Sequence, residues 1–281
     1  MEETIKPGAT GAPVDGTTRA AALNIFVGDP NFMMSLARGL LVITAFGQQK
    51  RGLSVAQLAL RTGLSRAAVR RCVYTLQQLG FATSEDERHF VLTPKTLSLG
   101  HAYLSSSPLA TLAAPILERV SQELHESCSV ATLEGDEIFY VARSKTTSRI
   151  MSVDLSVGSR LPAYCTSMGR VLLAALPPQQ LESFLSHIKL VKRTSYTVGD
   201  VPALREVLRT VGTQGYALID QELEVGLRSI AVPVYNAQHK VVAALNVGTH
   251  SSRISVGDME KRILPVLRGA ADELGVLLTG V

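Results

Sequence analysis

Residues 65–80 read SRAAVRRCVYTLQQLG, and this stretch decides the fold of the first third of the chain. On a helix that turns about 100° per residue, its apolar positions fall on one side. They are Val69, Cys72, Val73, Leu76, Leu79 and Gly80. Ser65 is a favoured N-cap residue and glycine commonly ends a helix, so the stretch predicts one amphipathic helix between Ser65 and Gly80.

The opposite face of this helix carries side chains suited to reading DNA. It presents Ala67, Arg70, Arg71, Tyr74 and Gln78. A guanidinium group forks onto guanine O6 and N7, and an amide pairs with adenine N6 and N7. A small alanine permits close approach. The pattern therefore predicts a recognition helix that lies in the major groove.

The residues on either side predict a winged helix-turn-helix. Ser54 is a good N-cap for a short helix that ends near Gly63, and a short link then leads to the recognition helix. Short strands at 81–83 and 89–93 enclose the polar turn 84–88 and predict a hairpin. Apolar residues at helical spacing predict an earlier helix between residues 32 and 47: Leu36, Leu40, Ile43 and Phe46.

Contacts with the DNA backbone are expected at helix starts and in the hairpin. Arg51, Ser54 and Ser65 lie where backbone N–H groups attract phosphate. Arg66 flanks the recognition helix, and Arg88 in the hairpin is placed to reach a neighbouring groove or the backbone. These residues complete the predicted DNA-binding set.

Charge along the chain supports a polyanionic partner for this domain. The net charge is only +4, but seven basic residues lie between Asn31 and Gly80, where there is no Asp or Glu. The rest of the chain holds 21 of the 28 basic residues and all 24 acidic ones. Such asymmetry is typical of a nucleic-acid-binding segment in an otherwise mildly acidic protein.

The remaining residues predict a second domain of mixed strands and helices. Helices are expected near 109–126, 167–176, 178–187, 200–212 and 255–278, and strands near 128–134, 137–144, 149–155, 215–221, 228–235 and 240–249. Strand pairs joined by short turns, with the helices kept apart, indicate an antiparallel α+β domain. The expected organisation is a disordered tail at 1–28, a winged helix-turn-helix at 29–93, a linker helix at 94–108 and an effector domain at 109–281.

Composition and motifs exclude several classes of protein. No apolar run reaches the roughly 18–20 residues of a membrane helix, and Glu2 and Glu3 precede no apolar stretch, so we expect neither a membrane span nor a secretory signal. Cys72, Cys128 and Cys165 lie far apart, which fits a reducing cytoplasm. No nucleotide-binding, metal-binding or nucleophile-elbow motif is present, so we expect no cofactor, no metal and no enzymatic activity.

Three stretches of the second domain carry a family resemblance: GSRLPAYCTSMGR at 158–170, GYALIDQELEVG at 215–226 and SIAVPV at 229–234. With the order of the domains, they make the chain resemble the IclR-type bacterial transcriptional regulators over about residues 30–280. Within that family it is most similar to the regulators of protocatechuate, β-ketoadipate and 4-hydroxybenzoate catabolism. The resemblance implies a GAF-like effector domain, a homodimer or dimer of dimers, double-stranded operator DNA and RNA polymerase as partners.

The first of these stretches predicts a carboxylate site. Ser167 is a suitable N-cap for the following helix, whose free N–H groups attract an anion, and Gly169 leaves room for a ligand. By resemblance the effector pocket begins here, at Thr166, Ser167 and Met168. Arg149 and Arg160 are candidates to hold the carboxylate through paired hydrogen bonds, and Tyr164 to stack on an aromatic ring.

Further effector contacts are expected on the later strands. Asp220 alternates with Glu222 and Glu224 along one face, for which a structural role is the more typical one. Ser229 and Asn246 occupy strand positions that, by resemblance, face the effector, and a buried polar group needs a partner. Two alternatives to an aromatic-acid regulator stay open: a regulator that senses a small aliphatic acid, and a sensor whose N-terminal domain binds protein. A hydrolase based on Cys165 lacks an identifiable base.

Overall fold

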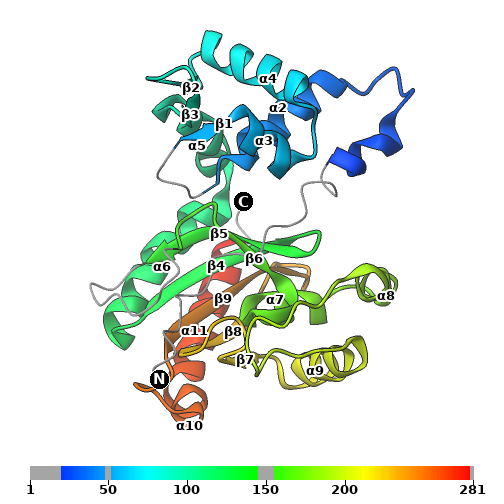
Figure 1. Ribbon diagram of the computed structural model, residues 1–281. Helices are drawn as coiled ribbons and strands as arrows, with labels where there is room; N and C mark the ends of the chain where they lie inside the picture. The colour runs from blue at the N-terminus through cyan, green and yellow to red at the C-terminus, as the bar shows by residue number, and fades with distance from the viewer. Residues whose placement is uncertain (1–19, 48–51, 145–154, 279–281) are drawn as a thin grey trace, which may run out of the picture. The chain divides into compact units, whose positions relative to one another are not determined.

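The computed structural model describes residues 20–47, 52–144 and 155–278 (Figure 1). Contacts divide the chain into two compact units between His101 and Ala102, inside the segment expected to form the linker. The boundary falls within helix α5 (Leu97–Ser106). The two units are described separately below.

The N-terminal unit is a winged helix-turn-helix, as predicted. Its elements are η1 (Ala22–Phe26), α2 (Met34–Ala45), β1 (Leu53–Ser54), α3 (Val55–Thr62), α4 (Arg66–Gln78), β2 (Ala82–Thr83), β3 (His89–Leu92), η2 (Pro94–Thr96) and the start of α5. The three strands form an antiparallel sheet in the order β1-β3-β2. The pairing of β1 with β3 is absent from the sequence-based prediction, because a two-residue strand leaves no periodic signal.

The core of this unit lies where α2, α3 and α4 meet the sheet. Val42, Leu58, Val69 and Val73 are almost fully buried there, together with Phe90 of the wing. The apolar faces predicted for two helices are wrong in part. Leu36 and Leu40 of α2, and Leu79 after α4, are more than half exposed. Helix α2 buries its C-terminal half instead, at Val42 and Ala45, because only that half lies against α3 and α4.

The predicted disordered tail extends too far toward the wing domain. Residues 22–26 form the 3₁₀ turn η1, and the rings of Phe26 and Phe32 stack with their centroids 4.2 Å apart. Residues 1–19, which make up most of the predicted tail, lie outside the described residues.

The C-terminal unit is an antiparallel α+β domain, which confirms the predicted class. Its elements are α6 (Pro108–Leu124), β4 (Ser127–Glu134), β5 (Glu137–Ser144), β6 (Arg160–Pro162), η3 (Ala163–Cys165), α7 (Ser167–Ala174), α8 (Pro178–His187), α9 (Val201–Gln214), β7 (Ala217–Asp220), β8 (Leu227–Tyr235), β9 (Val241–His250), α10 (Val256–Asp258), η4 (Met259–Ile263) and α11 (Leu264–Leu277). The strands form one sheet in the order β6-β5-β4-β9-β8-β7.

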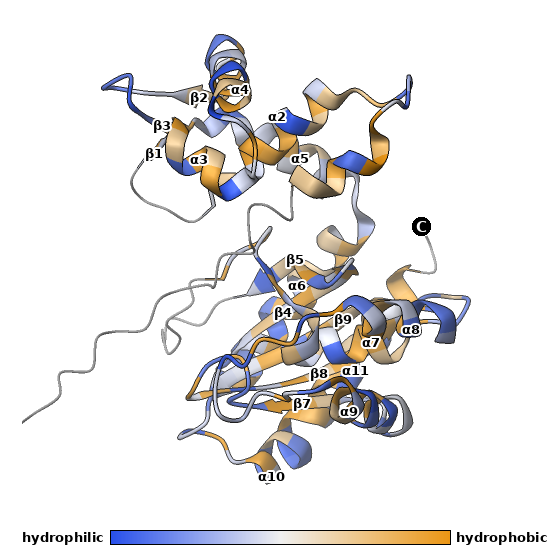
Figure 2. Ribbon diagram, turned by 45° about the vertical axis from the view of Figure 1, so that its right-hand side comes forward, coloured by the Kyte–Doolittle hydropathy of each residue, from blue (hydrophilic) through white to orange (hydrophobic). Residues whose placement is uncertain are grey.

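Helices cover both faces of this sheet (Figure 1). On one face, α6 and α11 pack on residues such as Cys128, Ile230 and Leu245. On the other face, α7, α8 and α9 pack on Ala131, Ile138 and neighbouring residues. Figure 2 shows both hydrophobic and hydrophilic colours along α9, as expected of an amphipathic helix. The cavity described below lies on the α7 face.

Two local features differ from the sequence-based expectation. Strand β6 was not predicted, and the strand predicted near 149–155 falls outside the described residues except for Leu155, which is not in a strand. The predicted final helix contains a π-helical segment, η4, just before Pro265. Proline lacks an N–H group, so a regular α-helical hydrogen bond is missing at this point.

Candidate nucleic-acid interface and ligand cavity

Helix α4 presents its polar face to solvent, as the recognition-helix prediction requires. The Ser65 hydroxyl caps the helix by accepting a hydrogen bond from the Ala68 N–H at 3.2 Å. The residues predicted to face DNA are all exposed: Arg66, Ala67, Arg70, Arg71, Tyr74 and Gln78. No acidic side chain lies on the helix, so its outer surface is uniformly positive or neutral.

Residues from the start of α3 and from the wing join α4 around one open hollow. Its lining includes Ser54 at the start of α3, Arg66, Arg70 and Tyr74 of α4, and Glu87 and Arg88 of the wing. Ser54 forms a capping box with Gln57, which fixes the first turn of α3. The hollow therefore gathers five of the residues predicted to bind DNA. Arg51 lies outside the described residues.

The wing turn is held by its own acidic residue. Asp86 accepts hydrogen bonds from the His89 imidazole at 2.6 Å, from the His89 N–H at 2.7 Å and from the Arg88 N–H at 2.9 Å. These bonds, the imidazole bond first, lower the pKa of Asp86 below its usual range. The turn thus stays negatively charged beside Arg88, which itself is exposed.

A small cavity lies between the sheet and the start of α7 in the C-terminal unit. About 30 Å³ inside it is accessible to the centre of a water molecule. Its lining is Ser127, Tyr140, Arg143, Leu155, Leu161, Cys165, Thr166, Ser167, Met168, Ile219, Leu223, Leu227, Ser229, Asn246 and Gly248. Apolar walls with a few polar groups are typical of a small-molecule site.

Five predicted effector residues line this cavity. Thr166, Ser167 and Met168 come from the start of α7, Ser229 from β8 and Asn246 from β9. Within the described part of the chain, the Ser167 hydroxyl and the Asn246 Oδ1 atom are buried without a hydrogen-bond partner. A ligand that hydrogen-bonds to them would relieve the cost of about 1–3 kcal/mol for each unmet group.

Arg143 is the charged group of the cavity, and the sequence-based prediction missed it. It is the one cation among the lining residues just named, and its Nη1 donates to Ser129 Oγ at 2.9 Å. A bulge in β5 turns it toward the cavity: the register shifts between Val130 and Ala131, so that Val141 is an extra residue. Plain alternation from Tyr140 would place Arg143 on the opposite face.

The other predicted effector residues make contacts elsewhere. Arg160 pairs with Glu137 at 3.2 Å, Tyr164 is buried and donates its hydroxyl to the Val191 carbonyl at 2.8 Å, and Asp220 binds Arg228 through both carboxylate oxygens at 2.9 Å. None of these three lines the described cavity. Arg149 lies outside the described residues.

The start of α7 differs in detail from the prediction. The N-cap is Thr166, whose hydroxyl accepts from the Gly169 N–H at 3.3 Å, so the Ser167 hydroxyl is not used as a cap. Gly169 serves packing and not ligand approach, because a Cβ there would lie 2.1 Å from the Ala163 carbonyl oxygen. Because of this close contact, the segment before α7 packs directly against the helix and forms part of the cavity wall.

Gly169→Ala is therefore expected to destabilise the C-terminal unit by about 1–3 kcal/mol or more, as overpacking of a tight core does. The matched control is Gly212→Ala in α9, where the nearest atom would be 3.8 Å away and alanine favours the helix. Thermal unfolding of the two variants tests this prediction. Equal midpoints for both would contradict the packing role of Gly169.

Cys165 lines the cavity but is not poised as a nucleophile. Burial raises the pKa of its thiol to about 11 and that of Cys128 to about 12. Among the described residues, no group of three or more His, Cys, Asp or Glu side chains is placed to hold a metal ion. The polar groups that line the cavity are hydrogen-bonding side chains and the guanidinium group of Arg143.

Alkylation tests this reading of the cysteines. Because the thiolate is the reactive form, iodoacetamide at pH 8 should modify Cys165 roughly a hundredfold and Cys128 roughly a thousandfold more slowly in the native protein than in denaturant. Half-buried Cys72 should react first. Peptide mass mapping over time measures the three rates, and native labelling of Cys165 at the denatured rate would contradict its burial.

A winged helix-turn-helix with a basic recognition face, followed by a domain with a small, mostly apolar cavity that carries a few polar groups, defines a ligand-responsive DNA-binding regulator. The model of the IclR helix-turn-helix domain matches residues 35–86, and the model of the bacterial transcriptional regulator IclR C-terminal domain matches residues 101–276. The chain belongs to the IclR family of bacterial transcriptional regulators. It is a regulator and not an enzyme.

Three relatives place the chain within this family. It is 54% identical to the Pca regulon regulatory protein of Pseudomonas putida, over 94% of this chain and 90% of that protein. It is 36% identical to the p-hydroxybenzoate hydroxylase transcriptional activator of Acinetobacter baylyi, over 87% and 91% of the two chains. An IclR homologue from Microbacterium hydrocarbonoxydans, solved in complex with 4-hydroxybenzoate, superposes with a TM-score of 0.72 at 27% identity, over 87% of this chain and 98% of that one.

No helix in the described ranges is both long and apolar enough to cross a membrane.

Proposed function

We propose that this protein regulates an operon for aromatic-acid catabolism and that its C-terminal cavity binds a small carboxylate. The ligand we propose is a monocyclic aromatic acid. The observation that carries the proposal is the cavity itself. Arg143 faces it together with the start of α7, and Ser167 and Asn246 bring polar atoms that lack partners in the described chain.

These groups suit an acid with a second polar end. An arginine binds a carboxylate through charge-assisted hydrogen bonds, and the N-terminus of α7 adds about half a positive charge. Asn246 and Ser229 come from the neighbouring strands β9 and β8 and offer hydrogen bonds to hydroxyl groups. Leu161, Ile219 and Leu223 supply apolar contacts to a ring.

The relatives support the aromatic class. The Pseudomonas putida relative is a regulator of the Pca regulon, the Acinetobacter relative activates a p-hydroxybenzoate hydroxylase gene, and the Microbacterium homologue was crystallised with 4-hydroxybenzoate. The 54% identity over nearly the whole chain makes the first of these the strongest support.

Exposed apolar side chains in the N-terminal unit support a homodimer. Leu36 and Leu40 of α2, and Leu97 and Leu99 of α5, are about half exposed or more. A second copy that covers them would bring two α4 helices to one palindromic operator, with half-sites about one helical turn or a multiple of it apart. Such a regulator acts in the cytoplasm with RNA polymerase at the promoter. Sedimentation at micromolar concentration tests the dimer.

The effector would act by changing the affinity of this dimer for DNA. A ligand shifts an equilibrium between two arrangements only if it binds them with different affinities. The expected consequence is a change in operator affinity when the cavity is filled.

A thermal-shift screen tests the proposed ligand class. The panel contains 4-hydroxybenzoate, protocatechuate, benzoate and β-ketoadipate, with Arg143→Met as the control protein. A ligand at 100 times its dissociation constant adds about 2.7 kcal/mol of stability, which is a readily measured shift. Stabilisation by an aromatic acid alone supports the proposal. Stabilisation by β-ketoadipate alone would replace the aromatic effector with an aliphatic one, and no shift with any acid would refute the assignment of the cavity.

A further inference from the structure

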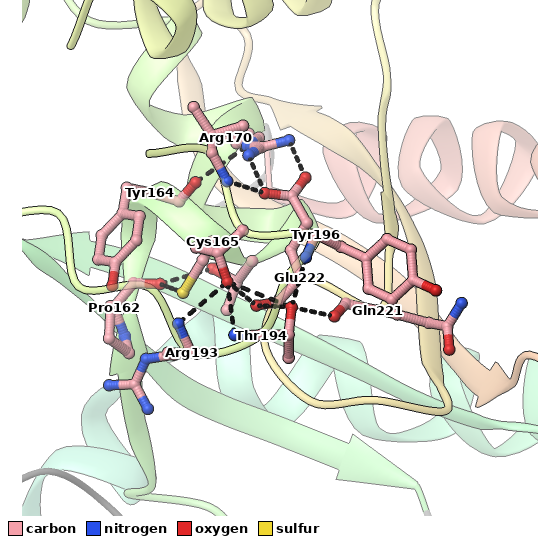
Figure 3. A network of polar contacts seen from close by, with 12 residues as sticks. Pro162, Tyr164, Cys165, Arg170, Arg193, Thr194, Tyr196, Gln221 and Glu222 are labelled. Carbon is pink, nitrogen blue, oxygen red and sulfur yellow. Dashed lines mark hydrogen bonds and ion pairs between the residues drawn. The ribbon is translucent and has the colours of Figure 1, made fainter. Parts of the chain in front are cut away.

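A buried ion pair lies directly behind the ligand cavity. Arg170 of α7 is 3% exposed and binds both carboxylate oxygens of Glu222 at 2.7 Å (Figure 3). Its Nε atom donates to the Tyr164 carbonyl at 2.9 Å. The pair thus ties α7 and the segment before it to the loop between β7 and β8.

A third segment is fastened to the same carboxylate. Glu222 accepts a hydrogen bond from the Val198 N–H at 3.0 Å, in the loop between α8 and α9. The hydroxyl of Thr197 donates to the Glu222 carbonyl at 2.6 Å. The hydroxyl of Thr194 donates to the Gln221 carbonyl at 2.8 Å (Figure 3). The Arg170–Glu222 pair and the backbone beside it therefore join three segments that are far apart in the sequence: the start of α7, the α8–α9 loop and the β7–β8 loop.

Two of these segments also form part of the cavity. Cys165 to Met168, just before Arg170, line it on one side, and Leu223, the residue after Glu222, lines it as well. Neither Arg170 nor Glu222 is itself among the lining residues. Any movement of the pair must therefore move the wall that contacts the effector.

We propose that the Arg170–Glu222 pair is a positioning element of the effector site, which holds the start of α7 and the β7–β8 loop in the geometry that binds the acid. The proposal rests on the assignment of the cavity as the effector site.

Energetic considerations favour positioning over stability alone as the role of this pair. A buried ion pair often contributes no more to stability than well-packed apolar residues would, because both charges lose their hydration. What it adds is a defined geometry, since the planar guanidinium accepts only certain orientations of the carboxylate. Removing one partner alone leaves an uncompensated buried charge and frees the loops.

The two charges also balance each other at the cavity wall. The pKa of Cys165 is raised mainly by burial, while Arg193 and, more weakly, Arg170 lower it and Glu222 raises it. Arg170 and Glu222 thus act on this lining residue with opposite signs.

Glu222→Gln is the variant that tests the proposal, because glutamine keeps the size of the side chain and removes its charge. The matched control is Glu126→Gln. Glu126 is likewise buried and paired with an arginine, Arg253, at 3.2 Å, and accepts from Thr249 at 2.9 Å. The residue after it, Ser127, lines the cavity as Leu223 does after Glu222, but Glu126 contacts none of the three joined segments. Arg170→Lys is a second variant, to be used if Glu222→Gln does not fold. Lysine keeps the positive charge but cannot form the two parallel hydrogen bonds of the guanidinium group.

Calorimetric titration uses whichever of 4-hydroxybenzoate, protocatechuate and β-ketoadipate stabilises the wild-type protein. Residues that orient a binding group from behind typically change affinity by roughly 10–100-fold when mutated at metal sites. We expect a loss of about tenfold for Glu222→Gln, a smaller loss for Arg170→Lys and a change within about twofold for Glu126→Gln. Both glutamine variants should unfold at a lower temperature than the wild type. Affinity is therefore measured well below both unfolding midpoints, where a loss of binding reports positioning and not reduced stability.

Amide hydrogen exchange gives a readout that needs no ligand. Residues 164–170 and 220–226 should exchange faster in Glu222→Gln than in the wild type or in Glu126→Gln. Unchanged affinity in Glu222→Gln, with a wild type that binds, overturns the positioning role and leaves the proposed function intact. If the wild type binds none of the three acids, the proposed function fails, and unchanged exchange would then overturn the positioning role as well.

Discussion

Replacing Arg70 and Arg71 together by alanine is expected to weaken specific operator binding by about 2–6 kcal/mol, because each good arginine–guanine pair contributes roughly 1–3 kcal/mol of discrimination. At about 1.4 kcal/mol per tenfold, this is a loss of roughly thirtyfold to ten-thousandfold. Both side chains are exposed on the outer face of α4, opposite the buried Val69 and Val73. Effector affinity should not change, because the cavity lies in the other unit.

Lysine variants and a charge control sharpen this experiment. Arg70→Lys with Arg71→Lys keeps both positive charges but loses the paired hydrogen bonds that guanidinium groups make to guanine. The attraction to phosphate and the salt dependence of DNA affinity should persist, while sequence discrimination falls. Arg209→Ala removes an equally exposed positive charge from α9 and should leave operator binding unchanged. Electrophoretic mobility shifts on operator and scrambled DNA at several salt concentrations measure these effects. Normal operator binding by the double alanine variant would refute the recognition-helix assignment.

Replacing Arg143 by methionine is expected to lower the affinity for a carboxylate effector by roughly tenfold to a hundredfold. Hydrogen bonds to charged groups contribute about 1.5–3 kcal/mol, and methionine keeps much of the volume of the side chain without its charge. DNA binding in the absence of effector should be unaffected. Titration calorimetry with the acid found in the screen measures the loss.

Arg160→Met is the matched control for Arg143→Met. Arg160 also lies on the sheet, in β6, but pairs with Glu137 and is not part of the cavity lining. Its loss should leave effector affinity within about twofold, since exposed ion pairs contribute only about 0–1 kcal/mol. The reverse result, with loss of affinity in Arg160→Met and none in Arg143→Met, would show that the carboxylate is held at the edge of the sheet.

Much of the fold was predictable because its signals are local. The caps Ser54 and Ser65, with glycine at positions 63 and 80, define two helices from a few neighbouring residues. The strands of the C-terminal unit follow from short apolar runs between turns. Helix α2 shows the limit of this reasoning: its apolar pattern is helical, but which side is covered depends on where α3 and α4 lie.

The candidate sites divide in the same way. The DNA-facing set was predictable because the polar face of one helix is a property of that helix alone. The cavity was predictable only in part: Ser167, Ser229 and Asn246 were found, whereas Arg143 was missed and Arg160, Tyr164 and Asp220 were misplaced. An arginine in an otherwise apolar strand was the available signal for Arg143, but plain alternation pointed it away from the cavity.

The sequence by itself determined the helices, their caps and the concentration of positive charge between Asn31 and Gly80, because these depend on residues within a few positions of one another. Which arginine faces the cavity, and which one pairs with Glu222, depends on contacts between residues that are distant in the chain. A single extra residue in β5 reverses the direction of Arg143, and Arg170 meets a carboxylate 52 residues further along the chain. Such choices depend on strand register and loop packing, which bring distant residues together and leave no local pattern.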